Sequence, residues 1–222
     1  MSVQPVAYQQ VAADVASHHV TLVAVSKTKP VEDIMALYEL GQRDFGENYV
    51  QELSLKQKQL PADIRWHFIG HLQTNKAKIL APYVHLVQSV DSLKLLGELD
   101  AQGRKTGRVI NCLLQVHIAK EDTKFGFSAA ELETLVNDST IARMDHIIVR
   151  GLMGMASFVD DLGQAAAEFR TLKNEYEKLA VRKSPNWQLS TLSMGMSSDY
   201  KVAIEEGSTM VRIGSLLFGA RE

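Results

Sequence analysis

A lysine stands at the end of an apolar segment near the start of the chain. The stretch TLVAVSKTKP, residues 21–30, runs from four apolar residues into a polar turn and a proline. This pattern predicts a buried strand over residues 21–26. Strand alternation then puts Lys27 on the same face as Val23 and Val25. Burial disfavours the charged ammonium form, so we expect the pKa of Lys27 to be lowered.

A neutral lysine amine can form a Schiff base with an aldehyde. That chemistry is the functional interpretation of Lys27. The alternative is that Lys27 is only the first polar residue after a strand and points to water, as many charged residues at strand ends do. This segment alone leaves both interpretations open.

Two later loops are rich in glycine and serine, and each leads into a predicted helix. In an eight-stranded α/β barrel, the loops after strands 7 and 8 commonly bind phosphate through backbone N–H groups and hydroxyls. We expect Ser197 to cap a helix over residues 198–206. The alternative is a pair of ordinary turns. The two loops supply five of the predicted cofactor-binding residues: Ser193, Met196, Ser197, Gly214 and Ser215.

Arg212 shares a predicted strand face with Gly214 and should therefore point into the same cavity. A buried arginine needs a partner, either a ligand or a carboxylate such as Glu47. A lysine amine, a phosphate site and an arginine together fit pyridoxal 5'-phosphate (PLP), with Arg212 facing the ring nitrogen. Arginine there favours an unprotonated ring, which is a weak electron sink. A class I aldolase with a phosphorylated substrate is the competing interpretation.

The surrounding pattern alternates strands with helices along the whole chain. A helix over residues 5–17 precedes eight strand–helix units with a repeat of about 27 residues, which predicts a single (β/α)8 TIM barrel of the α/β class. An open doubly wound sheet is the structural alternative. The expected strands cover residues 21–26, 43–46, 65–69, 84–90, 109–118, 146–151, 187–192 and 210–213. The other expected helices cover residues 31–40, 50–60, 74–80, 92–102, 128–136, 161–179, 198–206 and 215–220.

The composition suits one globular domain over residues 1–222. A net charge of −2 gives no reason to expect nucleic acid or an anionic membrane as a partner. The N-terminus lacks the pattern of a signal peptide, and no apolar run is long enough to span a bilayer. The lone cysteine, Cys112, and the histidine spacing predict neither a disulfide nor a metal site. We expect a cytoplasmic monomer.

At these residues the chain resembles the pyridoxal phosphate homeostasis protein family, single-domain relatives of the fold-type III alanine racemase barrel. The matching segments span almost the whole chain: AVSKTKP (24–30), FGENYVQE (45–52), WHFIGHLQTNK (66–76), RGLM (150–153), LSMGMSSD (192–199) and GSTMVRIGSLLFGAR (207–221).

The resemblance implies a role for particular residues. Lys27 would carry PLP as an aldimine, and Arg212 would lie near the ring nitrogen. Asn48 would line the pocket. Ser197, Gly214 and Ser215 would hold the phosphate. Family members lack the second domain of the racemases and the tyrosine base it helps to supply, so the resemblance implies PLP carriage and homeostasis without catalysis, with PLP-dependent apoenzymes as possible recipients.

The chain departs from the family pattern after the fifth predicted strand. His117 stands where the family usually has asparagine, which changes the polar lining on that side of the pocket. Lys124 is either a second PLP contact or a solvated loop residue. A fold-type III enzyme, a racemase or decarboxylase, is the alternative function. It needs an acid/base opposite Lys27, and His117 and Tyr49 are the nominees.

Overall fold

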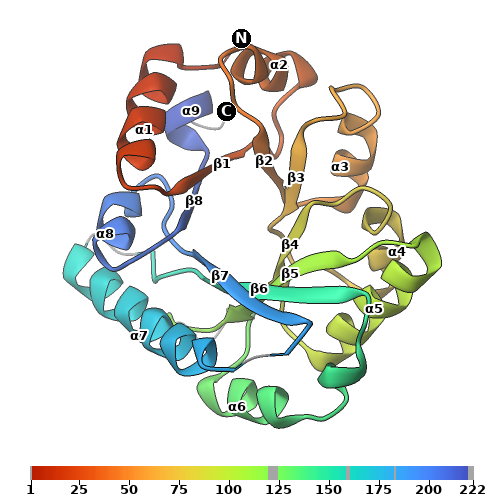
Figure 1. Ribbon diagram of the computed structural model, residues 1–222. Coiled ribbons are helices and arrows are strands. Elements are labelled where there is room, and N and C mark those ends of the chain that lie inside the picture. Colours follow the sequence, from red (N-terminus) through yellow and green to blue (C-terminus); the bar gives the residue numbers. More distant parts are fainter. Residues whose placement is uncertain (1, 120–124, 159–160, 183, 220–222) are drawn as a thin grey trace.

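Eight parallel strands close into a barrel (Figure 1). The computed structural model describes residues 2–119, 125–158, 161–182 and 184–219. Each strand pairs with the next one along the chain, and β8 pairs with β1. The predicted TIM barrel is therefore confirmed, and the open sheet is excluded. The strands are β1 (Thr21–Val25), β2 (Asp44–Glu47), β3 (Arg65–Phe68), β4 (Leu86–Val90), β5 (Ile110–Val116), β6 (Ile147–Gly154), β7 (Trp187–Ser193) and β8 (Met210–Ile213).

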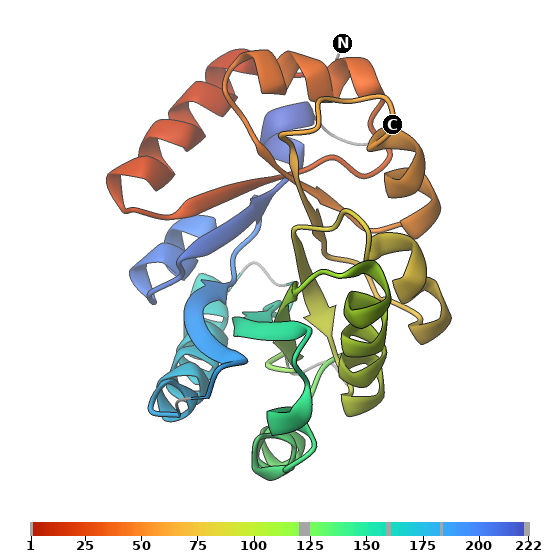
Figure 2. The same cartoon turned by 45° about the vertical axis from the view of Figure 1, so that its right-hand side comes forward.

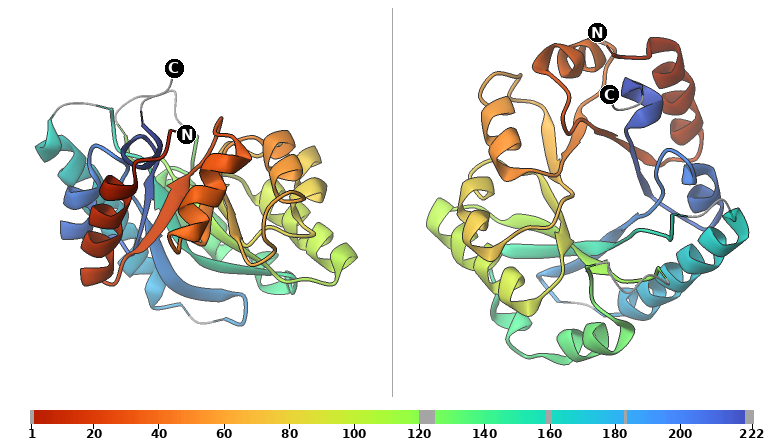
Figure 3. Two further views of the ribbon diagram at one scale, coloured as in Figure 1. Left: turned by 90° about the horizontal axis from the view of Figure 1, so that it is seen from above. Right: turned by 180° about the vertical axis from the view of Figure 1, so that it is seen from behind.

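Helices surround the barrel on its outer side (Figure 2). The predicted opening helix is present as α1, and it lies beside the final helix, α9 (Figure 3). None of the described helices combines the length and the apolar character needed to cross a bilayer. The helices are α1 (Pro5–Ser17), α2 (Val31–Glu39), α3 (Val50–Lys56), α4 (Ala77–Leu80), α5 (Leu93–Thr106), α6 (Ala129–Asn137), α7 (Leu162–Ala180), α8 (Tyr200–Glu205) and α9 (Ser215–Phe218), with 3-10 turns at Thr74–Lys76 and Ile141–Arg143.

The alternation of residues along the strands separates two buried layers. On β1, Leu22 and Ala24 belong to the large cluster between strands and helices, whereas Val23 belongs to a small cluster inside the barrel. Val23 therefore faces the barrel interior, which confirms that it lies on the opposite face from Leu22 and Ala24. The other buried members of the interior cluster are Leu86, Leu113, Met153 and Met210.

Two glycines that were read as ends of elements have other roles. Helix α5 continues past Gly103 and stops at Gly107, whose φ of 65° is the left-handed cap. A Cβ on Gly103 would lie 2.7 Å from the carbonyl oxygen of His146, so this glycine permits close packing. Strand β6 likewise runs through Gly151, where a Cβ would lie 1.7 Å from the carbonyl oxygen of Thr191. Close backbone approach is therefore the reason for both glycines.

A charged cluster holds the amino-terminal end of the barrel together. Asp44 accepts hydrogen bonds from Arg65 Nε at 2.7 Å and from His67 Nε2 at 3.0 Å. Burial by itself raises the pKa of Asp44, but the bonds from His67 and Arg65 outweigh it and lower the pKa to about 2.

We expect the ionisation of Asp44 to make the free energy of unfolding fall at acid pH. A carboxyl pKa that is lower in the folded than in the unfolded state adds stability above the unfolded value, and this stability is lost as the pH falls from about 4 to about 2. The contribution is at most about 2 kcal/mol. Urea unfolding of the parent protein and Asp44→Asn between pH 2 and pH 7 measures it. The two stability curves should converge at the acid end, and parallel curves would contradict the assignment.

Candidate functional site

A cavity of about 360 Å³ opens at the carboxyl end of the strands, where barrel enzymes place their sites. Its wall is built from residues at the carboxyl ends of β1 and β8 and in the segments that follow β1, β2, β3, β6, β7 and β8. The structure therefore brings together nearly all of the residues that the sequence predicted to bind the cofactor. Seven of the eight predicted residues line this cavity: Lys27, Asn48, Met196, Ser197, Arg212, Gly214 and Ser215.

Lys27 is half-buried, and buried ionic groups hold the residue that precedes it. Ser26 Oγ donates to Glu47 Oε1 at 2.6 Å. Lys56 Nζ donates to the same carboxylate oxygen and to the carbonyl oxygen of Ser26, both at 2.8 Å. Burial raises the pKa of Glu47, and Lys56 acts against this shift. The partner of Glu47 is thus Lys56, so the suggested ion pair between Glu47 and Arg212 is wrong.

The same network holds the residue that follows Lys27. Thr28 has a φ of 65°, a conformation that is uncommon for residues other than glycine. Its backbone N–H donates to Glu52 Oε1 at 2.7 Å, and Lys56 Nζ donates to that oxygen at 2.6 Å. Lys56 therefore bonds the Ser26 backbone directly and the Thr28 backbone through Glu52, so it holds the chain on both sides of Lys27.

Arg212 is 4% exposed and is tied to the barrel interior. Its Nη1 donates to Ser193 Oγ at 2.5 Å, and its Nη2 donates to the carbonyl oxygen of Gly154 at 2.9 Å. Burial lowers the pKa of Arg212 to about 10, with Asp199 acting in the opposite direction. The guanidinium is therefore charged at neutral pH. Its two hydrogen bonds hold it in a fixed orientation at the cavity wall.

Ser193 does not take the place that the sequence suggested. It is fully buried and is absent from the cavity wall, although it was predicted to contact the ligand. Strand β7 reaches Ser193 itself, so this residue points into the barrel below Arg212 instead of sitting in the loop above. Its observed role is to accept a hydrogen bond from Arg212.

The loops after β7 and β8 meet on the cavity wall. The N–H of Gly214 donates to Ser197 Oγ at 3.3 Å, and the N–H of Met196 donates to Asp199 Oδ1 at 2.6 Å. Helix α8 begins at Tyr200, so Ser197 is not its cap as predicted. The Ser197 hydroxyl contacts the neighbouring loop instead, and the two loops form one continuous polar surface.

Asn48 supplies an unsatisfied polar atom to the wall. Its Oδ1 is buried and has no hydrogen-bond partner among the described residues. A Cβ on Gly70 would lie 2.2 Å from the carbonyl oxygen of Asn48, so only glycine lets these two loops approach so closely. An orphaned buried acceptor beside a cavity calls for an additional donor there.

Sequence reasoning missed apolar members of the wall, among them Ile69 and Phe158. Ile69 shares the strand face of His67, so extending the alternation by two residues could have placed it at the mouth. Phe158 lies in a loop and is 83% exposed, a position with no periodic signal. Met155 is also in the wall.

The nominated acid/base residues lie elsewhere. Tyr49 is 56% exposed and His117 is half-buried, and neither belongs to the described cavity wall. His71, in the loop after β3, was not one of these nominees; it stacks on Phe125 with ring centroids 4.0 Å apart and bonds Asp91, outside the described wall. Lys124 lies outside the described residues.

The polar groups of this wall suit a phosphorylated aldehyde. They are a lysine amine, a buried guanidinium and serine hydroxyls as donors, with an unsatisfied amide oxygen as an acceptor. A volume of about 360 Å³ is in the range of small-ligand pockets. Within the described part of the chain, no group of three or more His, Cys, Asp or Glu side chains could hold a metal ion. The residues present thus fit PLP.

Comparison with known proteins supports the fold and shows the family. The sequence profile described as "Alanine racemase, N-terminal domain" matches residues 8–222. A protein named pyridoxal phosphate homeostasis protein from Pasteurella multocida is 43% identical over 208 residues, covering 91% of this chain and 87% of that protein.

Solved structures agree with this match. PipY of Synechococcus elongatus PCC7942, in a structure with PLP bound, is 37% identical with a TM-score of 0.82, covering 90% of this chain and 93% of that one. Alanine racemase from Streptomyces lavendulae is 17% identical with a TM-score of 0.76, covering 99% of this chain and 58% of that one. At that identity the racemase likeness concerns the fold alone.

Proposed function

This chain belongs to the family of the alanine racemase N-terminal domain and, within it, to the pyridoxal phosphate homeostasis proteins, and we propose that it binds PLP covalently through Lys27. The observation that carries the proposal is the single cavity wall that holds an amine, a guanidinium and two hydroxyl-bearing loops. When bound, PLP supplies an aldehyde that condenses with a neutral amine and releases water.

Each remaining group has a task in holding PLP. Arg212 faces the ring nitrogen, because it is the cationic donor fixed most deeply in the wall. The phosphate lies against Ser197 and Ser215, with Gly214 and Met196 completing that surface. Asn48 borders the ring, since it lines the same cavity as Lys27 and Arg212.

The protein carries PLP and keeps it available rather than catalysing an amino-acid reaction. Arg212 stays charged at neutral pH, so it donates to the ring nitrogen and leaves that nitrogen unprotonated. An unprotonated ring withdraws electrons weakly and stabilises carbanions poorly. The curated relatives are named as homeostasis proteins, which supports the same role. The recipients are PLP-dependent apoenzymes, and the protein acts as a cytoplasmic monomer.

A ligand comparison tests the phosphate surface. PLP should bind at least about tenfold more tightly than pyridoxal, which has the same aldehyde without the phosphate, because charge-assisted hydrogen bonds each contribute about 1.5–3 kcal/mol. Absorbance titration of the protein with each compound gives the two dissociation constants. Equal constants would remove the phosphate surface from the proposal.

Amino-acid turnover distinguishes the carrier from the enzyme alternative. The PLP-loaded protein, incubated with single L-amino acids, should yield neither D-enantiomers nor decarboxylated amines above the level of free PLP. Chiral chromatography of the mixture measures both products. Sustained turnover by the loaded protein would replace the carrier role with that of a racemase or decarboxylase.

A further inference from the structure

A line of buried polar side chains crosses the barrel interior below Arg212. Ser193 Oγ accepts from Arg212 Nη1 and donates to Gln88 Oε1 at 2.7 Å. The Gln88 amide nitrogen is 2.9 Å from His67 Nδ1, and His67 Nε2 is 3.0 Å from Asp44 Oδ1. All five residues are at most 8% exposed. The line therefore joins the cavity that holds Lys27 to the opposite end of the barrel.

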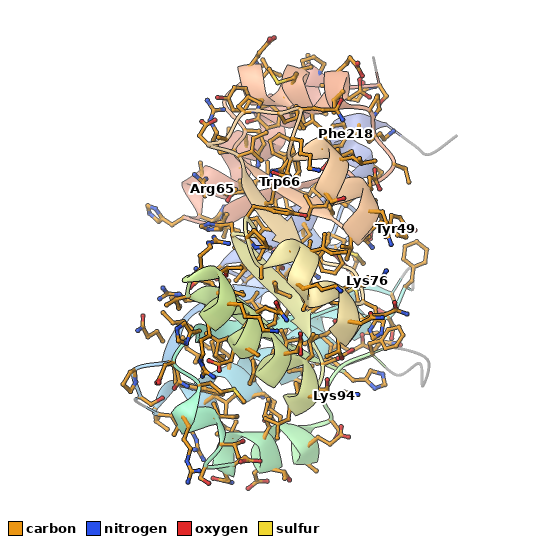
Figure 4. All side chains as sticks on the ribbon, turned by 90° about the vertical axis from the view of Figure 1, so that its right-hand side faces the viewer. Tyr49, Arg65, Trp66, Lys76, Lys94 and Phe218 are labelled. Carbon is orange, nitrogen blue, oxygen red and sulfur yellow. The ribbon has the colours of Figure 1, made fainter. Side chains whose placement is uncertain are left out.

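The far end of the line meets a second cavity. That cavity, of about 370 Å³, is lined by Asp44, His67 and Arg65 among others. Figure 4 shows Arg65 at the opposite end of the molecule from Tyr49, which follows β2 near the first cavity. The interior of a TIM barrel is usually filled by branched apolar side chains, so a continuous polar line there requires an explanation.

The donors and acceptors along the line fit only one direction. Gln88 Nε2 lies against two acceptors, His67 Nδ1 and the Met210 sulfur at 3.2 Å, so the amide oxygen faces Ser193. His67 must then accept at Nδ1 and carry its proton at Nε2, where Asp44 receives it. The carboxylate of Asp44 thus sets the tautomer of His67, and His67 sets the orientation of Gln88.

The orientation of Gln88 determines what Ser193 offers to Arg212. A hydroxyl has one hydrogen, and Gln88 Oε1 takes it, which leaves the lone pairs of Ser193 for the guanidinium. Without Gln88, the Ser193 hydroxyl hydrogen has no fixed acceptor and can rotate toward Arg212. There it opposes the N–H of Arg212, which is also a donor. The guanidinium then loses one of its two interior acceptors, the other being the carbonyl oxygen of Gly154.

We propose that Gln88 is a positioning residue: together with Ser193 and His67 it fixes the guanidinium of Arg212 in the orientation that meets the PLP ring nitrogen. This inference rests on the proposed function, because the consequence for the ligand requires PLP in the first cavity. The order of the buried groups exists without ligand and can be measured without it.

A double-mutant cycle in the full-length protein tests whether the line of buried polar side chains orients Arg212. Gln88→Met removes both amide interactions at similar volume, and Ser193→Ala removes the next link. Each should weaken PLP binding about tenfold and shift the absorption maximum of the bound cofactor, and the double variant should be no worse than the single ones. The matched control is Gln102→Met, a buried glutamine on α5 that bonds Glu98 outside the barrel interior and should leave both readouts unchanged.

One further measurement separates this inference from the proposed function. In the protein without PLP, the ¹⁵N NMR signals of His67 should report an Nε2–H tautomer that Gln88→Met perturbs and Gln102→Met does not. Ser193→Ala removes the hydroxyl between Gln88 and Arg212 with little change in volume, so it serves as the second variant if Gln88→Met does not fold.

The outcomes point in different directions. A parent protein that binds no PLP would remove the proposed function, while the His67 signals would still test the order of the line. Any of three results would overturn the role proposed for Gln88. They are an Nδ1–H tautomer of His67, additive losses in the double-mutant cycle, and parental PLP binding by Gln88→Met.

Discussion

Replacing Lys27 by alanine is expected to abolish covalent attachment of PLP while the barrel remains folded. Lys27 is half-buried at the end of β1, and its side chain lines the cavity without belonging to either apolar cluster. Its amine is the group that the proposal gives to the aldehyde. Borohydride treatment of the parent protein with PLP, followed by intact mass measurement, should show one reduced adduct, and Lys27→Ala should show none.

Lys29→Ala is the matched control for that experiment. Lys29 lines the same cavity two residues away, but its Nζ donates to the carbonyl oxygen of Phe218 at 3.0 Å. The control should therefore keep the adduct. Circular dichroism confirms that both variants are folded. Equal trapping of PLP by Lys27→Ala and by the parent would show that another amine carries the attachment.

Replacing Lys56 by methionine is expected to lower the free energy of unfolding more than any other substitution proposed for this protein. Lys56 is 6% exposed and bonds Glu47, Glu52 and the backbone of Ser26. Its removal leaves the fully buried Glu47 carboxylate without a cationic partner, a change that typically costs about 3–5 kcal/mol. Urea unfolding measures the difference. Because Lys56 holds the backbone of Ser26 directly and that of Thr28 through Glu52, PLP binding should weaken as well.

A surface ion pair provides the control for Lys56. Lys178 bonds Glu175 at 2.6 Å, but its side chain is 67% exposed, so Lys178→Met should cost at most about 1 kcal/mol. The double variant Lys56→Met with Glu47→Leu should recover part of the loss, since no charge remains buried alone. A Lys56→Met variant as stable as Lys178→Met would contradict the buried-network interpretation.

Local patterns in the sequence predicted the barrel and most of the cavity wall. The apolar run before Lys27 and the period of two on β8 placed Lys27 and Arg212 correctly, because a strand fixes where alternate side chains point. The order of strands and helices predicted the closed sheet. These features depend on neighbours along the chain, which a single sequence contains.

The errors have a common physical origin in contacts between distant segments. Gly103 and Gly151 were read as ends of elements, whereas each permits the approach of a backbone from elsewhere in the chain. The pairing of Glu47 with Lys56 depends on how α3 packs beside β2. Gln88 gave no signal at all, since a lone glutamine in a strand has no local pattern that reports its partners on three other strands.

The most direct test of the account is to locate the covalent bond in the parent protein. The purified protein is mixed with PLP, its visible absorption spectrum is recorded, and the sample is reduced with borohydride and mapped by peptide mass spectrometry. The account predicts a new absorption band and a single pyridoxyl group on Lys27. A protein that acquires no absorption band with PLP, or that carries the reduced group on a different lysine, would contradict it.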